Sequence, residues 1–142
     1  MSYEYPILKA SFLASANLST MQYMPCVLTT DATVALYGST ETGFLDRPPL
    51  GWLQDKSTAA GKTANVMLCG VTKAIVGGAS GLEMAILPGA WLVSTGGGVL
   101  PSSSGASNRL VGMALEACST FSATATPPVI AMLILRSNAI ST

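Results

Sequence analysis

Side chains that carry acid–base, nucleophilic or metal chemistry are scarce in this chain of 142 residues. The sequence has no histidine, and its 7 acidic and 7 basic side chains make up only 10% of the residues. Histidine is the usual general acid or base near neutral pH, and a Ser-His-Asp triad needs one. The carboxylates also lie far apart in the sequence, so no two of them form an obvious catalytic pair. We therefore expect a non-enzymatic protein without catalytic residues.

The segment Gly61-Lys62-Thr63 is similar to the end of a phosphate-binding loop. Such a loop needs a glycine five residues before its second glycine, because backbone N–H groups at the glycines cradle the phosphates. That position holds Lys56, and the residues between it and Gly61 are small and polar. The sequence thus predicts a turn here and no nucleotide site.

The three cysteines, Cys26, Cys69 and Cys118, are spaced too widely for a metal-binding pair, and an odd number does not suggest a disulfide framework. Each lies among apolar residues, so we expect buried free thiols that pack as small hydrophobic side chains. We expect neither a metal nor another cofactor.

The composition favours burial of surface over chemistry. Hydrophobic residues make up 49% of the chain, the formal net charge is +0, and the mean hydropathy is +0.49. The longest uninterrupted apolar run, residues 129–135, is much shorter than the ~20 residues of a membrane-spanning helix. The basic residues are spread along the chain, whereas a nucleic-acid-binding protein usually clusters them. We therefore expect no membrane span and no direct nucleic-acid binding, and a surface that other subunits partly cover.

Short runs rich in Val, Ile, Leu and Thr have the length of β-strands, with glycine- or proline-containing turns between many of them. These runs cover residues 24–30, 33–37, 66–76, 90–94, 110–116 and 129–135. Many short strands with frequent turns are typical of sandwiches and barrels, and no helical pattern of ten or more residues persists. We predict an all-β fold, as a small β-barrel or β-sandwich with an extended N-terminal arm.

In this interpretation residues 1–20 form the arm and residues 21–142 form the barrel or sandwich domain. The arm carries Tyr3, Tyr5, Ile7 and Phe12 among small and polar residues, without a clear period. Leaving so many apolar side chains in water is unfavourable, so we expect the arm to dock on the body or on a neighbouring subunit. Alternatively, it is the first strand of the barrel with a frayed end.

Several short motifs occur in a defined order: Ala-Asn-Leu-Ser at 16–19, Gln-Tyr at 22–23, Gly-Trp-Leu-Gln at 51–54, Gly-Val-Thr-Lys-Ala at 70–74 and Leu-Val-Gly-Met-Ala-Leu-Glu-Ala at 110–117. With the glycines at 77–78 and the final apolar run, this ordered set resembles the family of small tailed-phage capsid decoration, or cement, proteins. The resemblance covers about residues 12–136. The loops at 37–50 and 119–128 depart from the family's pattern, which bears on loop contacts more than on the fold.

The resemblance implies a small β-barrel or sandwich protein, made in the host cytoplasm, that binds the outer surface of a phage head. Its implied partners are the major capsid protein and further copies of itself, as a homotrimer or alternatively a dimer. A cement protein needs self-complementary apolar surface and no chemistry, which agrees with the composition. The alternative is another virion structural module, such as a tail or fibre domain with a binding role.

Five residues are candidates for contacts with the capsid or with another subunit. Four of them, Tyr3, Tyr5, Ile7 and Phe12, are the large apolar side chains of the arm, and the fifth is Trp52. For Trp52, as for Trp91, packing in the core is the default expectation and burial in an interface is the alternative.

Overall fold

The computed structural model describes residues 5–29, 32–37, 48–77, 85–102, 110–119 and 126–135 of the chain. These residues form β-strands joined by turns, and no helix among them is long and apolar enough to cross a membrane. The strands are β1 (Tyr5–Ala14), β2 (Pro25–Leu28), β3 (Thr33–Leu36), β4 (Gly51–Leu53), β5 (Thr63–Ile75), β6 (Trp91–Thr95), β7 (Gly98–Pro101), β8 (Leu110–Ala114) and β9 (Val129–Ile134). The predicted all-β class is confirmed, and each of the six predicted runs overlaps a strand.

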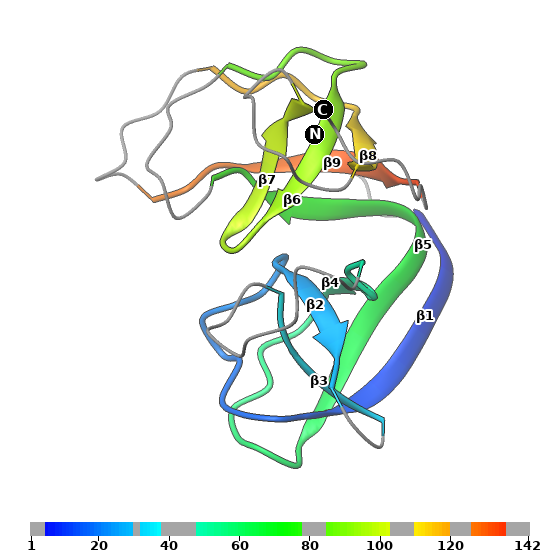
Figure 1. Ribbon diagram of the computed structural model, residues 1–142, viewed down its shortest axis with the longest axis vertical. Helices are drawn as coiled ribbons and strands as arrows, with labels where there is room; N and C mark the ends of the chain where they lie inside the picture. Colours follow the sequence, from blue (N-terminus) through cyan, green and yellow to red (C-terminus); the bar gives the residue numbers. More distant parts are fainter. Residues whose placement is uncertain are drawn as a thin grey trace.

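All nine strands belong to one mixed sheet with the order β1-β3-β2-β4-β5-β9-β8-β6-β7 (Figure 1). The pairings are antiparallel except for the parallel contact between β1 and β3. The 13 residues of β5 give it a contour of roughly 43 Å. This length lets β5 run through both halves of the molecule, with β2, β3 and β4 beside its first part and β9 beside its second.

Each half of the sheet curls until its ends nearly meet. In the lower half of Figure 1, β1 pairs with β5 on one side and with β3 on the other, at Leu13 and Ala14. In the upper half, an isolated parallel bridge joins Val76, just after β5, to Val99 of β7. Because both closures are so short, the fold is a curled sheet with barrel-like halves and not a regular closed barrel.

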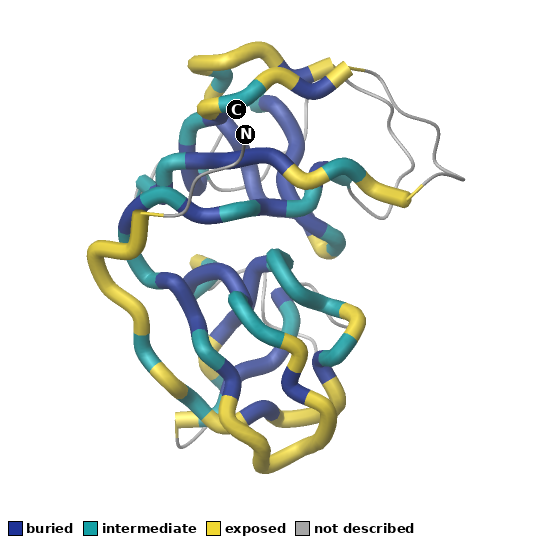
Figure 2. Tube along the Cα trace, turned by 180° about the vertical axis from the view of Figure 1, so that it is seen from behind, coloured by how far each residue is buried: buried dark blue, intermediate teal, exposed yellow. Residues whose placement is uncertain are grey.

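Two hydrophobic cores fill the two halves. The upper core takes alternate residues of β9, namely Ile130, Met132 and Ile134, and packs them against β6, β7 and β8. The lower core contains Leu53 and Val66, with other residues of β1 to β5. The core residues of β9 are spaced two apart, as the period-2 alternation of a strand predicts, whereas all four residues of β7 are buried. Figure 2 shows the buried segments on the inner side of each half.

The predicted N-terminal arm is, over its described part, a strand of the sheet. Strand β1 pairs antiparallel with β5 from Tyr5 opposite Val71 to Leu13 opposite Thr63, with irregularities around Leu8. Its pairing partner therefore belongs to the same chain. Most of β1 is nevertheless exposed, because no second layer covers it (Figure 2).

Gly70 makes the close approach of β1 and β5 possible where β5 bends. Its φ is +117°, and a Cβ atom there would lie 2.3 Å from the carbonyl oxygen of Tyr5 and 2.8 Å from the nitrogen of Ile7. Only a residue without a side chain fits this position, since both the left-handed backbone and the space exclude a Cβ.

Candidate interaction surface

The two carboxylates that the structure describes, Asp55 and Glu116, hold loops to strands. Both carboxylate oxygens of Asp55 accept from the backbone N–H of Asn65, and one also accepts from its side-chain amide at 2.7 Å. Glu116 accepts from the N–H of Ala131 at 2.9 Å. Among the described residues no group of three or more Cys, Asp or Glu side chains is placed to hold a metal ion. These carboxylates act as hydrogen-bond acceptors within the fold.

The cysteines are free, and two of the three are buried. Burial, the largest cause, raises the pKa of Cys26 to about 12, a nearby hydrogen bond from the Leu53 backbone lowers it, and the charge of Asp55 raises it further. Burial also raises the pKa of Cys118. The prediction of buried thiols is confirmed for these two, while Cys69 is half-buried. A thiol kept protonated in this way is a poor nucleophile, so Cys26 and Cys118 serve packing.

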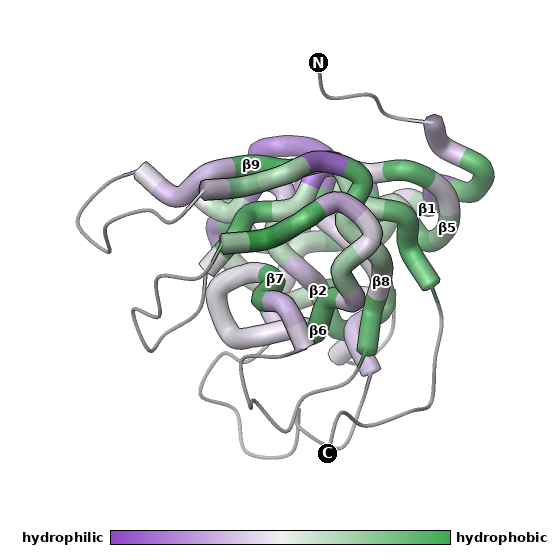
Figure 3. The backbone as a smooth tube through the Cα atoms, turned by 90° about the horizontal axis from the view of Figure 1, so that it is seen from above, coloured by the Kyte–Doolittle hydropathy of each residue, from purple (hydrophilic) through white to green (hydrophobic). Residues whose placement is uncertain are grey.

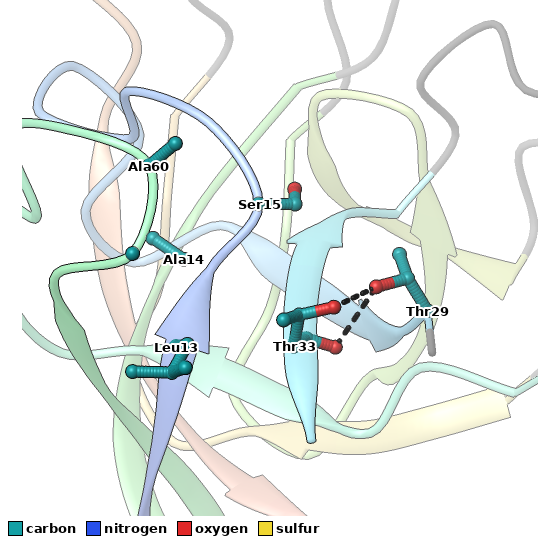
Figure 4. Close-up of a pocket in the computed structure, with 7 residues that line it drawn as sticks. Leu13, Ala14, Ser15, Thr29, Thr33 and Ala60 are labelled. Carbon is teal, nitrogen blue, oxygen red and sulfur yellow. Dashed lines mark hydrogen bonds between the residues drawn. The ribbon is translucent and has the colours of Figure 1, made fainter. Parts of the chain in front are cut away.

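A pocket of about 470 Å³ lies where the end of β1 meets the β2–β3 hairpin and the turn at Gly61 (Figure 4). Its polar groups include the hydroxyls of Ser15, Thr29 and Thr33. The Thr29 hydroxyl donates to the Thr33 carbonyl at 3.1 Å, and the two threonine hydroxyls are hydrogen-bonded to each other. None of the lining side chains ionises, so the pocket offers no acid–base group.

A row of apolar side chains crosses the outer face of the sheet, away from the upper core. Residues directly opposite each other in neighbouring strands carry their side chains on the same face. Trp91 of β6 is opposite Met113 of β8, and Met113 is opposite Leu133 of β9. Leu133 is opposite Val71 of β5, and Val71 is opposite Tyr5 of β1. These five residues, the outer apolar row, thus extend over five strands.

The next positions along the same face are apolar as well, apart from one lysine. Leu115 donates its N–H to the carbonyl of Ala131, which lies opposite Lys73 in β5. The Lys73 amine sits 5.4 Å from the centroid of the Tyr23 ring, a cation–π distance. Figure 3 shows hydrophobic segments of β1, β5 and β8 in a view from above. Of the three residues at these next positions, Leu115 and Ala131 are apolar and Lys73 is charged.

The outer apolar row is open to solvent at its two ends. Tyr5 is 71% exposed and Trp91 is 52% exposed, while Met113, Leu133 and Val71 between them are half-buried. Because aromatic side chains of this kind present about 150–250 Å², the two end residues alone leave roughly 250 Å² in water. Because the end residues lie about 19 Å apart across the five strands, with apolar side chains between them, the row is a candidate contact surface.

The five candidate contact residues fall into different environments. Tyr5 and Ile7 are exposed, Ile7 by 76%, and Phe12 is half-buried against the lower core. Tyr3 lies outside the described residues. Trp52 is only 1% exposed and belongs to the upper core. Its indole cannot reach a partner on the folded surface, so core packing is the interpretation that its burial supports, and we remove Trp52 from the contact set.

Trp91, for which core packing was the default expectation, is the half-exposed tryptophan at the end of the outer apolar row. It is the first residue of β6, and the next two residues, Leu92 and Val93, are fully buried. The sequence gives no signal that separates Trp91 from Trp52, because each follows a proline and a glycine. Only the strand pairing distinguishes them.

No protein-family model matches the chain, and no curated protein shows significant similarity to it. A functional assignment therefore rests on the fold, on the outer apolar row and on the ordered motifs of the sequence.

Proposed function

We propose that the protein is a capsid decoration protein that docks on the outer surface of a phage head and holds neighbouring major capsid subunits together. The observation that carries the proposal is the outer apolar row, whose end residues Trp91 and Tyr5 are exposed, in a chain with few side chains suited to catalysis. The ordered motifs described above supply the second support.

The size of the row predicts a weak single contact. Burying roughly 250 Å² of apolar surface contributes about 6 kcal/mol before costs. The loss of translational and rotational freedom on binding costs an estimated 4–15 kcal/mol. One contact of this kind is therefore marginal. Many copies that each join two or more capsid subunits bind through avidity, which is what a cement protein requires.

The direct experiment is co-sedimentation of the purified protein with mature capsid shells from which it has been stripped. We expect stoichiometric rebinding and a raised resistance of the shells to heat. Trp91→Ser removes the half-exposed indole, which is worth about 3 kcal/mol of apolar contact, and should weaken rebinding about 100-fold. Leu28→Ser is the matched control, because Leu28 is 39% exposed on β2, outside the outer apolar row.

Unchanged rebinding of Trp91→Ser, or equal weakening by Leu28→Ser, would contradict the docking surface. A well-folded wild-type protein that does not bind shells at all would contradict the capsid role. It would favour the alternative of a tail or fibre module with a binding role.

Removal of residues 1–15 is a poor test of the arm, although it is the obvious one. Ala14 is 1% exposed in the lower core, and Phe12 packs against that core. The truncation would also remove the strand that pairs with both β3 and β5. Single substitutions at exposed positions such as Tyr5 and Ile7 test the contact without opening the sheet.

A further inference from the structure

Strand β1 has a free edge over most of its length. One edge pairs with β5 throughout, whereas β3 occupies the other edge only at Leu13 and Ala14. In the part of the chain that the structure describes, nothing pairs with that second edge between Tyr5 and Phe12. An open edge of this kind is a template on which another strand can add.

The hydrogen bonds at the end of β1 identify which backbone groups face the free edge. Ala14 donates its N–H to Lys62 on the β5 side, while Leu13 donates to the carbonyl of Ala32 on the β3 side. Because successive residues of a strand point their N–H and C=O groups to opposite edges, Lys9 and Ser11 share the orientation of Leu13. Both residues therefore present an N–H and a C=O outward.

We propose that this edge pairs with the same edge of a second copy, forming a two-fold symmetric dimer through antiparallel β1 strands. The two-fold axis passes between the Ala10 residues of the two copies. Lys9 of each copy then exchanges both backbone hydrogen bonds with Ser11 of the other, which gives four main-chain bonds. An antiparallel strand pair is self-complementary, as a two-fold contact requires.

The other registers that pair outward-facing residues are worse. Centring the axis on Lys9 places two ammonium groups directly opposite each other, which is unfavourable. Centring it on Ser11 leaves Lys9 opposite Leu13, whose N–H is already bonded to Ala32. The charge on Lys9 thus selects the register centred on Ala10. Pro6, which has no N–H, and the irregular pairing around Leu8 end the regular edge on its N-terminal side.

The inference does not depend on capsid binding and is tested without capsids. Analytical ultracentrifugation over a concentration series should show the wild type passing from one chain of 14.5 kDa to a species of twice that mass. Ser11→Pro removes an N–H from the free edge and none from the β5 side, and its ring blocks the approaching strand. We expect this variant to dimerise at least 10-fold more weakly, with an unchanged circular dichroism spectrum.

Ser11→Ala is the matched control. It removes the bond from the Ser11 hydroxyl to the Asn65 side chain, 2.7 Å long, but keeps the backbone N–H. Its dimerisation should equal that of the wild type. A wild type that stays a single chain up to about 1 mM overturns the proposal, as does a Ser11→Pro variant that associates like Ser11→Ala.

Disulfide trapping tests the register independently of Ser11→Pro. The two Ala10 residues form a pair without mutual hydrogen bonds, whose Cα atoms lie about 4.5 Å apart, within the range that a disulfide spans. In a Cys69→Ser background, Ala10→Cys should therefore cross-link under mild oxidation. Leu8→Cys should not, because the two Leu8 positions are four residues, about 14 Å, apart along the strands. Equal cross-linking at both positions, or stronger cross-linking at Leu8, overturns the register.

Discussion

Replacing Gly70 with alanine tests how closely β1 and β5 approach each other. An alanine Cβ would lie 2.3 Å from the carbonyl oxygen of Tyr5, so the two backbones must separate by about 1 Å to restore an ordinary contact. The left-handed φ of +117° adds a conformational penalty of about 1–2 kcal/mol. Either the strain stays in the fold or the first residues of β1 leave β5.

Gly61→Ala separates the conformational penalty of a positive φ from the steric cost of the contact with Tyr5. Gly61 also has a positive φ, +76°, but a Cβ atom there meets nothing within 4 Å. We expect Gly61→Ala to lower the free energy of unfolding by about 1–2 kcal/mol. Gly70→Ala should cost about 2–4 kcal/mol, since separation of Tyr5 to Ile7 from β5 loses one or two further hydrogen bonds at about 1 kcal/mol each.

Urea unfolding measures both free energies, and amide hydrogen exchange reports where the damage lies. Exchange should accelerate in Gly70→Ala at the N-terminal end of β1 and stay unchanged there in Gly61→Ala. Equal destabilisation by the two substitutions, with unchanged exchange in β1, would refute the close approach at Gly70.

Two further predictions concern the upper core and a buried thiol. Met132→Ala should lower the free energy of unfolding by about 2–5 kcal/mol in a urea titration, because Met132 is fully buried. Leu133→Ala, on the outer face of the same strand, should lower it by less than half as much. Similar losses for the two variants would contradict the assigned faces of β9. Stability should fall as the pH rises above 9, because the Cys26 thiol ionises at its ordinary pKa of 9.0 when unfolded while burial raises the folded pKa to about 12. Between these two pKa values the thiol lowers the stability by about 1.4 kcal/mol per pH unit, and below them it has no such effect. In thermal unfolding at pH 9–11, the stability of Cys26→Ala should therefore fall less steeply with pH than that of the wild type. An equally steep fall would contradict the burial of the Cys26 thiol.

Strands with one buried face could be predicted from the sequence, and very short strands could not. The run at 129–135 is apolar throughout, so its length and the two prolines before it indicated a strand, while its sequence shows no alternation that separates the core face from the outer face. Strand β7 (Gly98–Pro101) begins with glycine and ends with proline, residues that indicate turns. It forms because the hairpin after β6 pairs Ser94 with Val99, and its four residues are buried between neighbours.

The described part of the arm left two alternatives open in the sequence because most of β1 is exposed and only its C-terminal end, with Phe12 and Ala14, reaches the lower core. Without a buried face a strand has no period, and the irregular pairing at Ile7 and Leu8 interrupts what alternation there is. The pairing with β5 also depends on Gly70, more than sixty residues away. The residues of β1 alone therefore do not indicate that the strand pairs with β5.

The outer apolar row could not be predicted, because it is a property of the register of five strands. Trp52 and Trp91 follow similar local sequences, yet Trp52 pairs with Met67 and turns into the upper core, while Trp91 pairs with Met113 and turns outward. A shift of one residue in either strand would exchange these environments.

Hydroxyl-radical footprinting of the protein, free and bound to capsid shells, tests the docking surface most directly. Mass spectrometry of the two samples gives the modification rate at each side chain. If the outer apolar row docks on the capsid, Trp91 and Tyr5 become protected on shells while Leu28 reacts at its free rate. Shell-bound protein in which Trp91 and Tyr5 react as fast as in the free protein would contradict this account.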